Sequence, residues 1–123
     1  MTSPKLIWIV EDHAPFRRTL AKALNTEADL CCAREYDSCE AALENLSKES
    51  APDVLLLDVG LPGMSGHEVA KVLRSGGFTG TLIALTGYSD ESDHIQSRQS
   101  GFDHHLVKPI GIADLRKVLP KFS

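Results

Sequence analysis

Short apolar runs recur five times along this chain of 123 residues, and a segment of helical periodicity follows each one. The runs are KLIWIV (5–10), LCCAREY (30–36), VLLL (54–57), TLIAL (81–85) and HLV (105–107). Short strands that are apolar on both faces are typical of parallel sheets covered by helices. Five strand-helix units are too few for an eight-stranded barrel, so we expect an α/β fold with an open, doubly wound, five-stranded parallel sheet.

The segments between the strands carry signals for helix ends. We expect helices to begin near Pro15 and after a Ser38 cap, to end at Gly76, and to end before Pro120. The segment 89–101 differs from the others because Ile95 is its only aliphatic residue. It has almost no apolar stripe, so we expect it to form the loosest helix.

Length and composition restrict the class of protein. The length predicts one domain over residues 1–123. A formal charge of −4 without a basic run gives no sign of a nucleic-acid-binding face. No apolar run approaches the ~18 residues that span a bilayer, and the first four residues do not resemble a signal peptide. We therefore expect a cytoplasmic protein that does not bind membranes.

The three cysteines agree with that compartment. Cys31 and Cys32 are neighbours in an apolar stretch and Cys39 stands alone, so the chain has neither a CxxC pair nor a metal-type spacing. We expect buried or half-buried reduced thiols.

Polar side chains follow four of the five apolar runs. They are Glu11 and Asp12, Asp58, Thr86, and Lys108. Ligands of open parallel sheets bind beyond the carboxyl ends of the strands, and these ends share one edge of the sheet. We therefore expect the five residues to converge there and to form a site.

The charges of these residues predict the chemistry of the site. Two carboxylates about 4 Å apart repel each other by roughly 4 kcal/mol at an effective dielectric of ~20, so three of them require a cation. Oxygen ligands favour Mg²⁺, which is commonly shared with a phosphate. Asp58 is then placed as a nucleophile toward phosphorus. Lys108 and Thr86 would neutralise and hydrogen-bond the phosphoryl oxygens.

Four motifs in this order resemble the receiver domain of two-component response regulators. They are the acidic pair ED (11–12), LLLDVGLPGMSG around Asp58, ALTG with Thr86, and HLVKP with Lys108 and Pro109. Each motif is weak alone, but their order and spacing together are highly specific. The resemblance covers nearly the whole chain.

The resemblance implies a flavodoxin-like sheet with strand order 2-1-3-4-5. It further implies a phosphoacceptor signalling domain that takes a phosphoryl group onto Asp58 from a phosphohistidine on a histidine kinase or phosphotransfer protein. Mg²⁺ would be held by Asp12, Asp58, the carbonyl group of Gly60 and, through water, Glu11. Such a domain catalyses only its own phosphorylation and dephosphorylation. Its output face, made by the fourth helix, fifth strand and fifth helix, would contact a downstream protein that the sequence does not name.

Three alternatives belong to other classes. A haloacid-dehalogenase-like phosphohydrolase normally has a second Asp two residues after the nucleophile, where this chain has Gly60. A flavodoxin-type cofactor binder needs a Ser, Thr or Gly loop after the first strand, and EDHAP would repel a phosphate there. A receiver that only docks, without phosphorylation, stays open.

Two positions depart from the family's pattern. His105 stands where the family usually has an aromatic switch residue, three positions before the lysine, and Tyr88 stands two residues after Thr86. Imidazole is small and titrates near pH 6.5, so burying it beside a charged site is unfavourable unless it is neutral or paired. We predict that His105 stays near the surface on the partner-binding face. The competing hypothesis is that it turns inward on phosphorylation.

Overall fold

The computed structural model describes residues 4–46, 51–59, 66–87 and 101–119, which form five strands and four helices. The elements are β1 (Lys5–Val10), α1 (Ala14–Asn25), β2 (Leu30–Tyr36), α2 (Cys39–Leu46), β3 (Val54–Asp58), α3 (Gly66–Ser75), β4 (Thr81–Thr86), β5 (His104–Val107) and α5 (Ile112–Val118). All strand pairs are parallel, and the order is β2-β1-β3-β4-β5. The predicted flavodoxin-like fold and strand order are confirmed.

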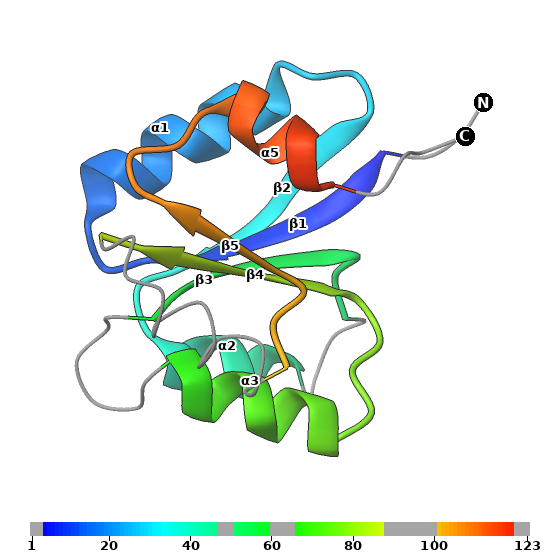
Figure 1. The fold of residues 1–123 in the computed structure, drawn as a ribbon. Helices are drawn as coiled ribbons and strands as arrows, with labels where there is room; N and C mark the ends of the chain where they lie inside the picture. The colour runs from blue at the N-terminus through cyan, green and yellow to red at the C-terminus, as the bar shows by residue number, and fades with distance from the viewer. Residues whose placement is uncertain (1–3, 47–50, 60–65, 88–100, 120–123) are drawn as a thin grey trace.

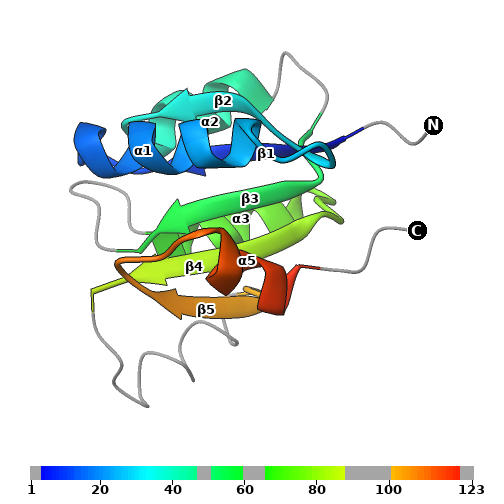
Figure 2. The same cartoon turned by 90° about the horizontal axis from the view of Figure 1, so that it is seen from above.

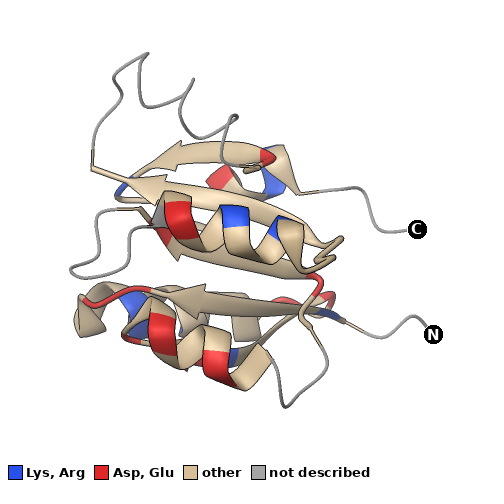
Figure 3. Ribbon diagram, turned by 90° about the horizontal axis from the view of Figure 1, so that it is seen from below, with Lys and Arg blue, Asp and Glu red and all other residues tan. Residues whose placement is uncertain are grey.

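The helices cover both faces of the sheet. α1 and α5 lie on one face, and α2 and α3 lie on the other (Figure 1). Seen from above, the strand arrowheads point the same way, so the carboxyl ends of the strands share one edge (Figure 2). Acidic positions lie along the outer side of α2 (Figure 3). Glu40 and Glu44 of this helix are exposed. This layering leaves the carboxyl edge as the place where loops from both faces meet.

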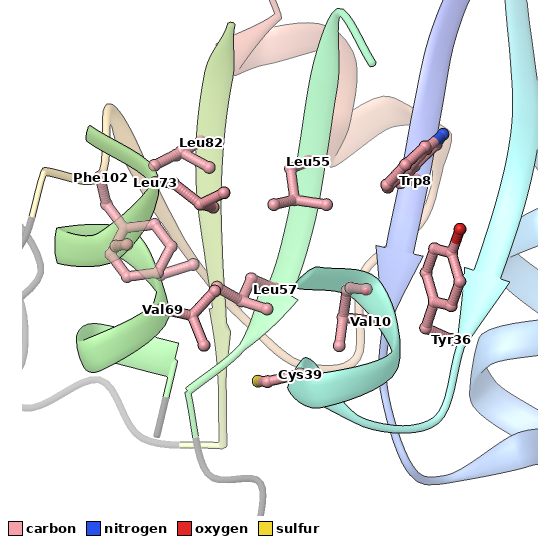
Figure 4. Close-up of a cluster of buried hydrophobic side chains, with 13 residues drawn as sticks. Trp8, Val10, Tyr36, Cys39, Leu55, Leu57, Val69, Leu73, Leu82 and Phe102 are labelled. Carbon is pink, nitrogen blue, oxygen red and sulfur yellow. The ribbon is translucent and has the colours of Figure 1, made fainter. Parts of the chain in front are cut away.

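The two faces of the sheet bury alternate residues of each strand. On β1, Ile7 and Ile9 pack with α1 and α5, whereas Trp8 and Val10 pack with α2 and α3. The buried cluster that contains Trp8 and Val10 is drawn in Figure 4. In it the ring of Trp8 meets that of Tyr36 edge-on, with the ring centroids 5.2 Å apart. Because both faces are covered, the three inner strands β1, β3 and β4 have continuous buried apolar runs instead of alternating with polar residues, whereas the edge strands β2 and β5 also carry polar residues.

The described helix ends agree with the sequence signals. The Ser38 hydroxyl accepts a hydrogen bond from the backbone N–H of Ala41 at 3.2 Å, which confirms the predicted cap. At the end of α3, Gly77 has a φ of 93°, a conformation that glycine adopts without a steric penalty. The helix predicted over 89–101 lies outside the described residues except for Gly101.

Three strands are each one residue longer than the sequence analysis predicts, and β5 is one of them because it begins at His104. β3 includes Asp58, whose Cα pairs with Leu85, and β4 includes Thr86, whose Cα pairs with Val107. Both polar residues therefore end their strands and do not follow them. The reason is that the backbone ladder continues past the last apolar side chain, since it depends on main-chain groups.

An arginine joins the segments that precede β4 and β5. Arg74 of α3 donates to the carbonyl oxygens of Phe78 and Gly80, both at 2.9 Å, and to that of Gly101 at 3.0 Å. It also bonds Oδ2 of Asp103 at 2.7 Å. Because each donor of the guanidinium has a fixed direction, Arg74 holds these segments together at the amino edge of the sheet.

A second arginine, Arg116, holds the segment that precedes β2. Arg116 of α5 bonds both carboxylate oxygens of Asp29, at 2.6 and 2.7 Å, and Oε1 of Glu27 at 2.9 Å. The bond to Arg116 lowers the pKa of the Asp29 carboxyl. The amino edge of the sheet is thus closed by two arginine clusters, opposite the edge that carries the predicted site.

Candidate functional site

Asp58 lies at the end of the central strand β3, with 6% of its surface exposed. The ammonium group of Lys108, in the loop after β5, donates to Oδ2 of Asp58 at 3.0 Å. The backbone N–H of Lys108 donates to the carbonyl oxygen of Thr86 at 2.6 Å, which attaches this loop to the end of β4. The Lys108–Pro109 peptide bond is cis. The structure thus brings Lys108 to Asp58, as expected.

Glu11 shares the same lysine. It is completely buried, and its Oε1 accepts a hydrogen bond from Lys108 Nζ at 2.6 Å while its Oε2 accepts one from the backbone N–H of His13 at 3.2 Å. Asp12 is exposed next to it. Carboxylate oxygens of Glu11, Asp12 and Asp58 lie within 4.8 Å of one another. Residues from the loop after β1, from β3 and from the loop after β5 therefore form one cluster at the carboxyl edge.

The cluster carries more negative charge than Lys108 neutralises. Burial, together with the neighbouring Asp58, raises the pKa of the Glu11 carboxyl to about 7, although the Lys108 ammonium opposes this rise. Burial lowers the pKa of Lys108, but the two carboxylates outweigh burial, so this pKa is raised overall. The raised pKa and the three close carboxylates together indicate that a further cation would be stabilised here.

The remaining predicted residues have different positions. Thr86 is buried at the end of β4, beside Asp58 in the sheet order. Gly60 and Tyr88 lie outside the described residues. His105 is half-buried in β5, opposite Ala84 of β4, and its Nε2 atom is shielded from solvent.

Sequence reasoning missed the surroundings of the lysine. A recess of about 290 Å³ lies beside the cluster, lined by Glu11, His13, Phe16, Lys108 and Pro109. The ammonium of Lys108 lies 5.5 Å from the centre of the Phe16 ring. The apolar pattern of α1 places Phe16 on its inner face, but no pattern in the sequence predicts that this face extends to the lysine.

The donor set fits a hard divalent cation. Mg²⁺ binds oxygen ligands at 2.0–2.1 Å in an octahedron, so two of its ligand atoms lie at most about 4.2 Å apart. The carboxylate oxygens of Glu11, Asp12 and Asp58 are within 4.8 Å of one another and need to close only slightly. The site has neither thiolate nor imidazole among these three groups, which is the chemistry that favours Mg²⁺ over zinc.

This chain combines a doubly wound parallel sheet with an acidic cluster and a lysine at the carboxyl edge of that sheet. These features together define a class of α/β domains that have an anionic site at this edge. The family model for the response regulator receiver domain matches residues 7–120. The chain belongs to the response regulator receiver domain family.

Curated relatives agree with this family. The chain is 44% identical over 107 residues to the transcriptional regulatory protein KdpE of Mycobacterium tuberculosis, a match that covers 87% of this chain and 46% of the relative. It is 35% identical over 121 residues to the phosphate regulon transcriptional regulatory protein PhoB of Pseudomonas aeruginosa, covering 94% and 52% of the two chains. The chain thus spans about half the length of these relatives.

Solved structures of receiver domains have the same fold. The receiver domain of the putative response regulator NarL from Mycobacterium tuberculosis superposes with a TM-score of 0.86 at 28% identity, covering 94% of this chain and 93% of that one. A putative response regulator from Chloroflexus aurantiacus has a TM-score of 0.83 at 29% identity, with coverage of 94% and 93%.

Among the described helices, none has the length and apolar character needed to cross a membrane.

Proposed function

We propose that this receiver domain accepts a phosphoryl group on Asp58 with Mg²⁺ and that phosphorylation switches its binding to a downstream protein. One observation carries the proposal: Lys108 bonds both Asp58 and Glu11, so residues from three distant segments meet at the carboxylate that the family motif places at this point. The buried end of a central strand holds Asp58 in position for attack on phosphorus.

Asp12, Asp58, the carbonyl group of Gly60 and, through water, Glu11 are the proposed ligands of Mg²⁺. Gly60 lies outside the described residues, and the carboxylate oxygens of the other three are close enough for the coordination sphere. When bound, Mg²⁺ would neutralise the crowded carboxylates and the oxygens of the incoming phosphoryl group.

The side chains of the protein have separate roles in phosphoryl transfer. A carboxylate oxygen of Asp58 forms the new bond to phosphorus while the bond between phosphorus and the donor's nitrogen breaks. The donor ring, protonated on its other nitrogen, keeps the electron pair of the broken bond and leaves as a neutral imidazole. The ammonium of Lys108 then faces a phosphoryl oxygen in addition to its carboxylate partners. The hydroxyl of Thr86 would donate a hydrogen bond to another phosphoryl oxygen.

The proposed donor is a histidine kinase or a histidine phosphotransfer protein. The domain, residues 1–123, modifies only itself, so it is a regulator and not an enzyme with a separate substrate. The proposed output face includes β5 and α5, and its partner is a protein and not a nucleic acid or a membrane, since the net charge is −4. The proposed localisation of the domain is the cytoplasm.

Phosphorylation by a small-molecule donor tests the proposal. With Mg²⁺ and a phosphoramidate, wild-type protein should gain one hydroxylamine-sensitive phosphoryl group by intact mass, and Asp58→Asn should gain none. Asp37→Asn, which removes an exposed carboxylate just beyond β2, is the matched control and should be labelled like wild type.

Each other outcome of this experiment would support a different acceptor residue or a different function. Labelling of Asp58→Asn would exclude Asp58 as the acceptor. A wild-type protein that binds Mg²⁺ but is never labelled would instead be a docking receiver. Continuous release of inorganic phosphate in many turnovers from a phosphate ester would favour the phosphohydrolase.

A further inference from the structure

Arg17 contacts the backbone of the acidic pair. It lies one turn into α1, where its backbone N–H bonds the carbonyl oxygen of His13 at 3.0 Å. Its Nη1 donates to the carbonyl oxygen of Glu11 at 2.7 Å, and its Nε donates to Oε1 of Glu35 on β2 at 3.3 Å. Only 12% of the Arg17 side chain is exposed. A half-buried guanidinium with two fixed bonds is rigid, since its planar fork loses little freedom on binding.

The carbonyl group that Arg17 holds belongs to the peptide unit between Glu11 and Asp12. A peptide unit is planar, so a bond to its oxygen sets the direction of the whole plane. The preceding peptide unit is held as well, because the N–H of Glu11 donates to the carbonyl oxygen of Tyr36 at 2.9 Å. β1 ends at Val10, so the Glu11–Asp12 peptide unit lies beyond the strand. The orientation of this unit depends on the hydrogen bond from the side chain of Arg17.

We propose that Arg17 is a positioning residue for the Mg²⁺ site: it fixes the Glu11–Asp12 peptide plane and thereby aims the two carboxylates at the cation. This inference rests on the proposed function. Mg²⁺ requires near-octahedral geometry, so small errors in the direction of a carboxylate weaken binding. Groups that orient metal ligands typically contribute 10–100-fold to metal affinity.

The positive charge of Arg17 and its hydrogen bond to Glu11 should have opposite effects on the affinity for Mg²⁺. If only its positive charge mattered, removing it would make the cluster more negative and tighten the binding of a cation. If its hydrogen bond to Glu11 matters more, removing it weakens the binding because the peptide plane can rotate. The sign of the change in Mg²⁺ affinity therefore separates the two roles.

The test compares Arg17→Met with Arg18→Met in the whole chain. Arg18 is the exposed neighbour of Arg17, so its variant removes the same charge without the bond to Glu11. Mg²⁺ is titrated by amide chemical shifts without any phosphodonor. We expect Kd to rise about tenfold in Arg17→Met and to stay equal or fall slightly in Arg18→Met.

A measurement without metal reports the peptide plane directly. The amide N–H of Asp12 belongs to the unit that Arg17 holds. Its NMR order parameter should be near the ~0.85 of a rigid backbone in wild type and in Arg18→Met, and lower in Arg17→Met. If Arg17→Met does not fold, Arg17→Lys takes its place, since it keeps the charge but loses the fork, and should raise Kd several-fold.

The outcomes are distinct. Equal or tighter Mg²⁺ binding by the Arg17 variant that folds, relative to Arg18→Met, overturns the positioning role and leaves the proposed function intact. Failure of the wild-type protein to bind Mg²⁺ overturns both. Weaker binding together with a more mobile Asp12 amide supports the inference.

Discussion

The ammonium nitrogen of Lys108 lies 2.6 Å from Oε1 of Glu11, although 97 residues separate the two in the chain. Lys108→Met should therefore destabilise the metal-free protein, because it leaves Glu11 and Asp58 buried without their cation. Removing one partner of a buried ion pair costs about 3–5 kcal/mol, and we expect a loss near the lower end because the Lys108 side chain is 25% exposed. Urea unfolding without divalent ions measures the change.

Lys71→Met is the matched control for this experiment. Lys71 is exposed on α3, and its replacement should change the free energy of unfolding by less than about 0.5 kcal/mol. Equal stability of the two variants would show that Lys108 does not neutralise the cluster.

Asp12→Ala should separate metal binding from stability. It removes one of three crowded carboxylates, so repulsion in the metal-free protein falls and its melting temperature should not fall. Mg²⁺ binding and phosphoryl labelling should both weaken. Calorimetry and a Mg²⁺ titration give the two values, and a clearly lower melting temperature without metal would contradict the crowding argument.

Three glycines separate backbone strain from steric contact. Gly77 has a φ of 93° with open space around it, so Gly77→Ala should lose about 1–2 kcal/mol from the left-handed conformation alone. At Gly101, with a φ of 105°, an added Cβ would also lie 2.7 Å from Cγ of Arg74. Gly101→Ala should lose more, about 3 kcal/mol. Gly111→Ala, with neither constraint, is the control, and a loss like that of Gly101→Ala would refute this explanation.

The cysteines should differ in their reaction with iodoacetamide. Burial raises the pKa of the Cys32 thiol to about 12 and that of the Cys39 thiol to about 11, so few thiolates form at pH 8. We expect half-buried Cys31 to be alkylated first in the folded protein, as read by fragment mass spectra. In urea the three should react alike.

The same two thiols give stability a dependence on alkaline pH. An ordinary thiol titrates near 9.0, below the values in the folded protein. The unfolded chain therefore ionises first, and the free energy of unfolding should fall as the pH rises above about 9. Cys32→Ser should reduce that slope, and an unchanged slope in this variant would exclude Cys32 as a source.

His105 remains a prediction about the phosphorylated state. We expect its ring to stay on the side of the partner-binding face when a phosphoryl mimic such as beryllofluoride occupies Asp58. Structures with and without the mimic decide this. An inward turn of His105 coupled to a shift of Thr86 would establish the competing switch.

The fold was predictable because apolar periodicity depends on local residues. KLIWIV coincides with β1, and the Ser38 cap and the glycines after α3 lie where the pattern predicts. The strand ends at Asp58 and Thr86 were displaced by one residue because the main-chain ladder, and not side-chain polarity, ends a strand.

The convergence of Glu11, Asp58 and Lys108 was predictable as well, since parallel strands share a carboxyl edge. The hydrogen bond from Arg17 to the carbonyl group of Glu11 was not predictable from the sequence. A backbone acceptor leaves no trace in the sequence, and the direction of a long side chain is set by tertiary packing. The roles of these residues in phosphoryl transfer stay predictions.

The two arginine clusters at the amino edge have a mechanical consequence. Arg74 holds Gly80 and Asp103, which directly precede β4 and β5, and Arg116 holds Asp29 before β2. These bonds fix the entry of three strands at the edge of the sheet opposite Asp58 and Lys108. A substitution or a ligand at the proposed Mg²⁺ site therefore touches neither arginine cluster, and the register of the strands at their amino ends does not depend on that site.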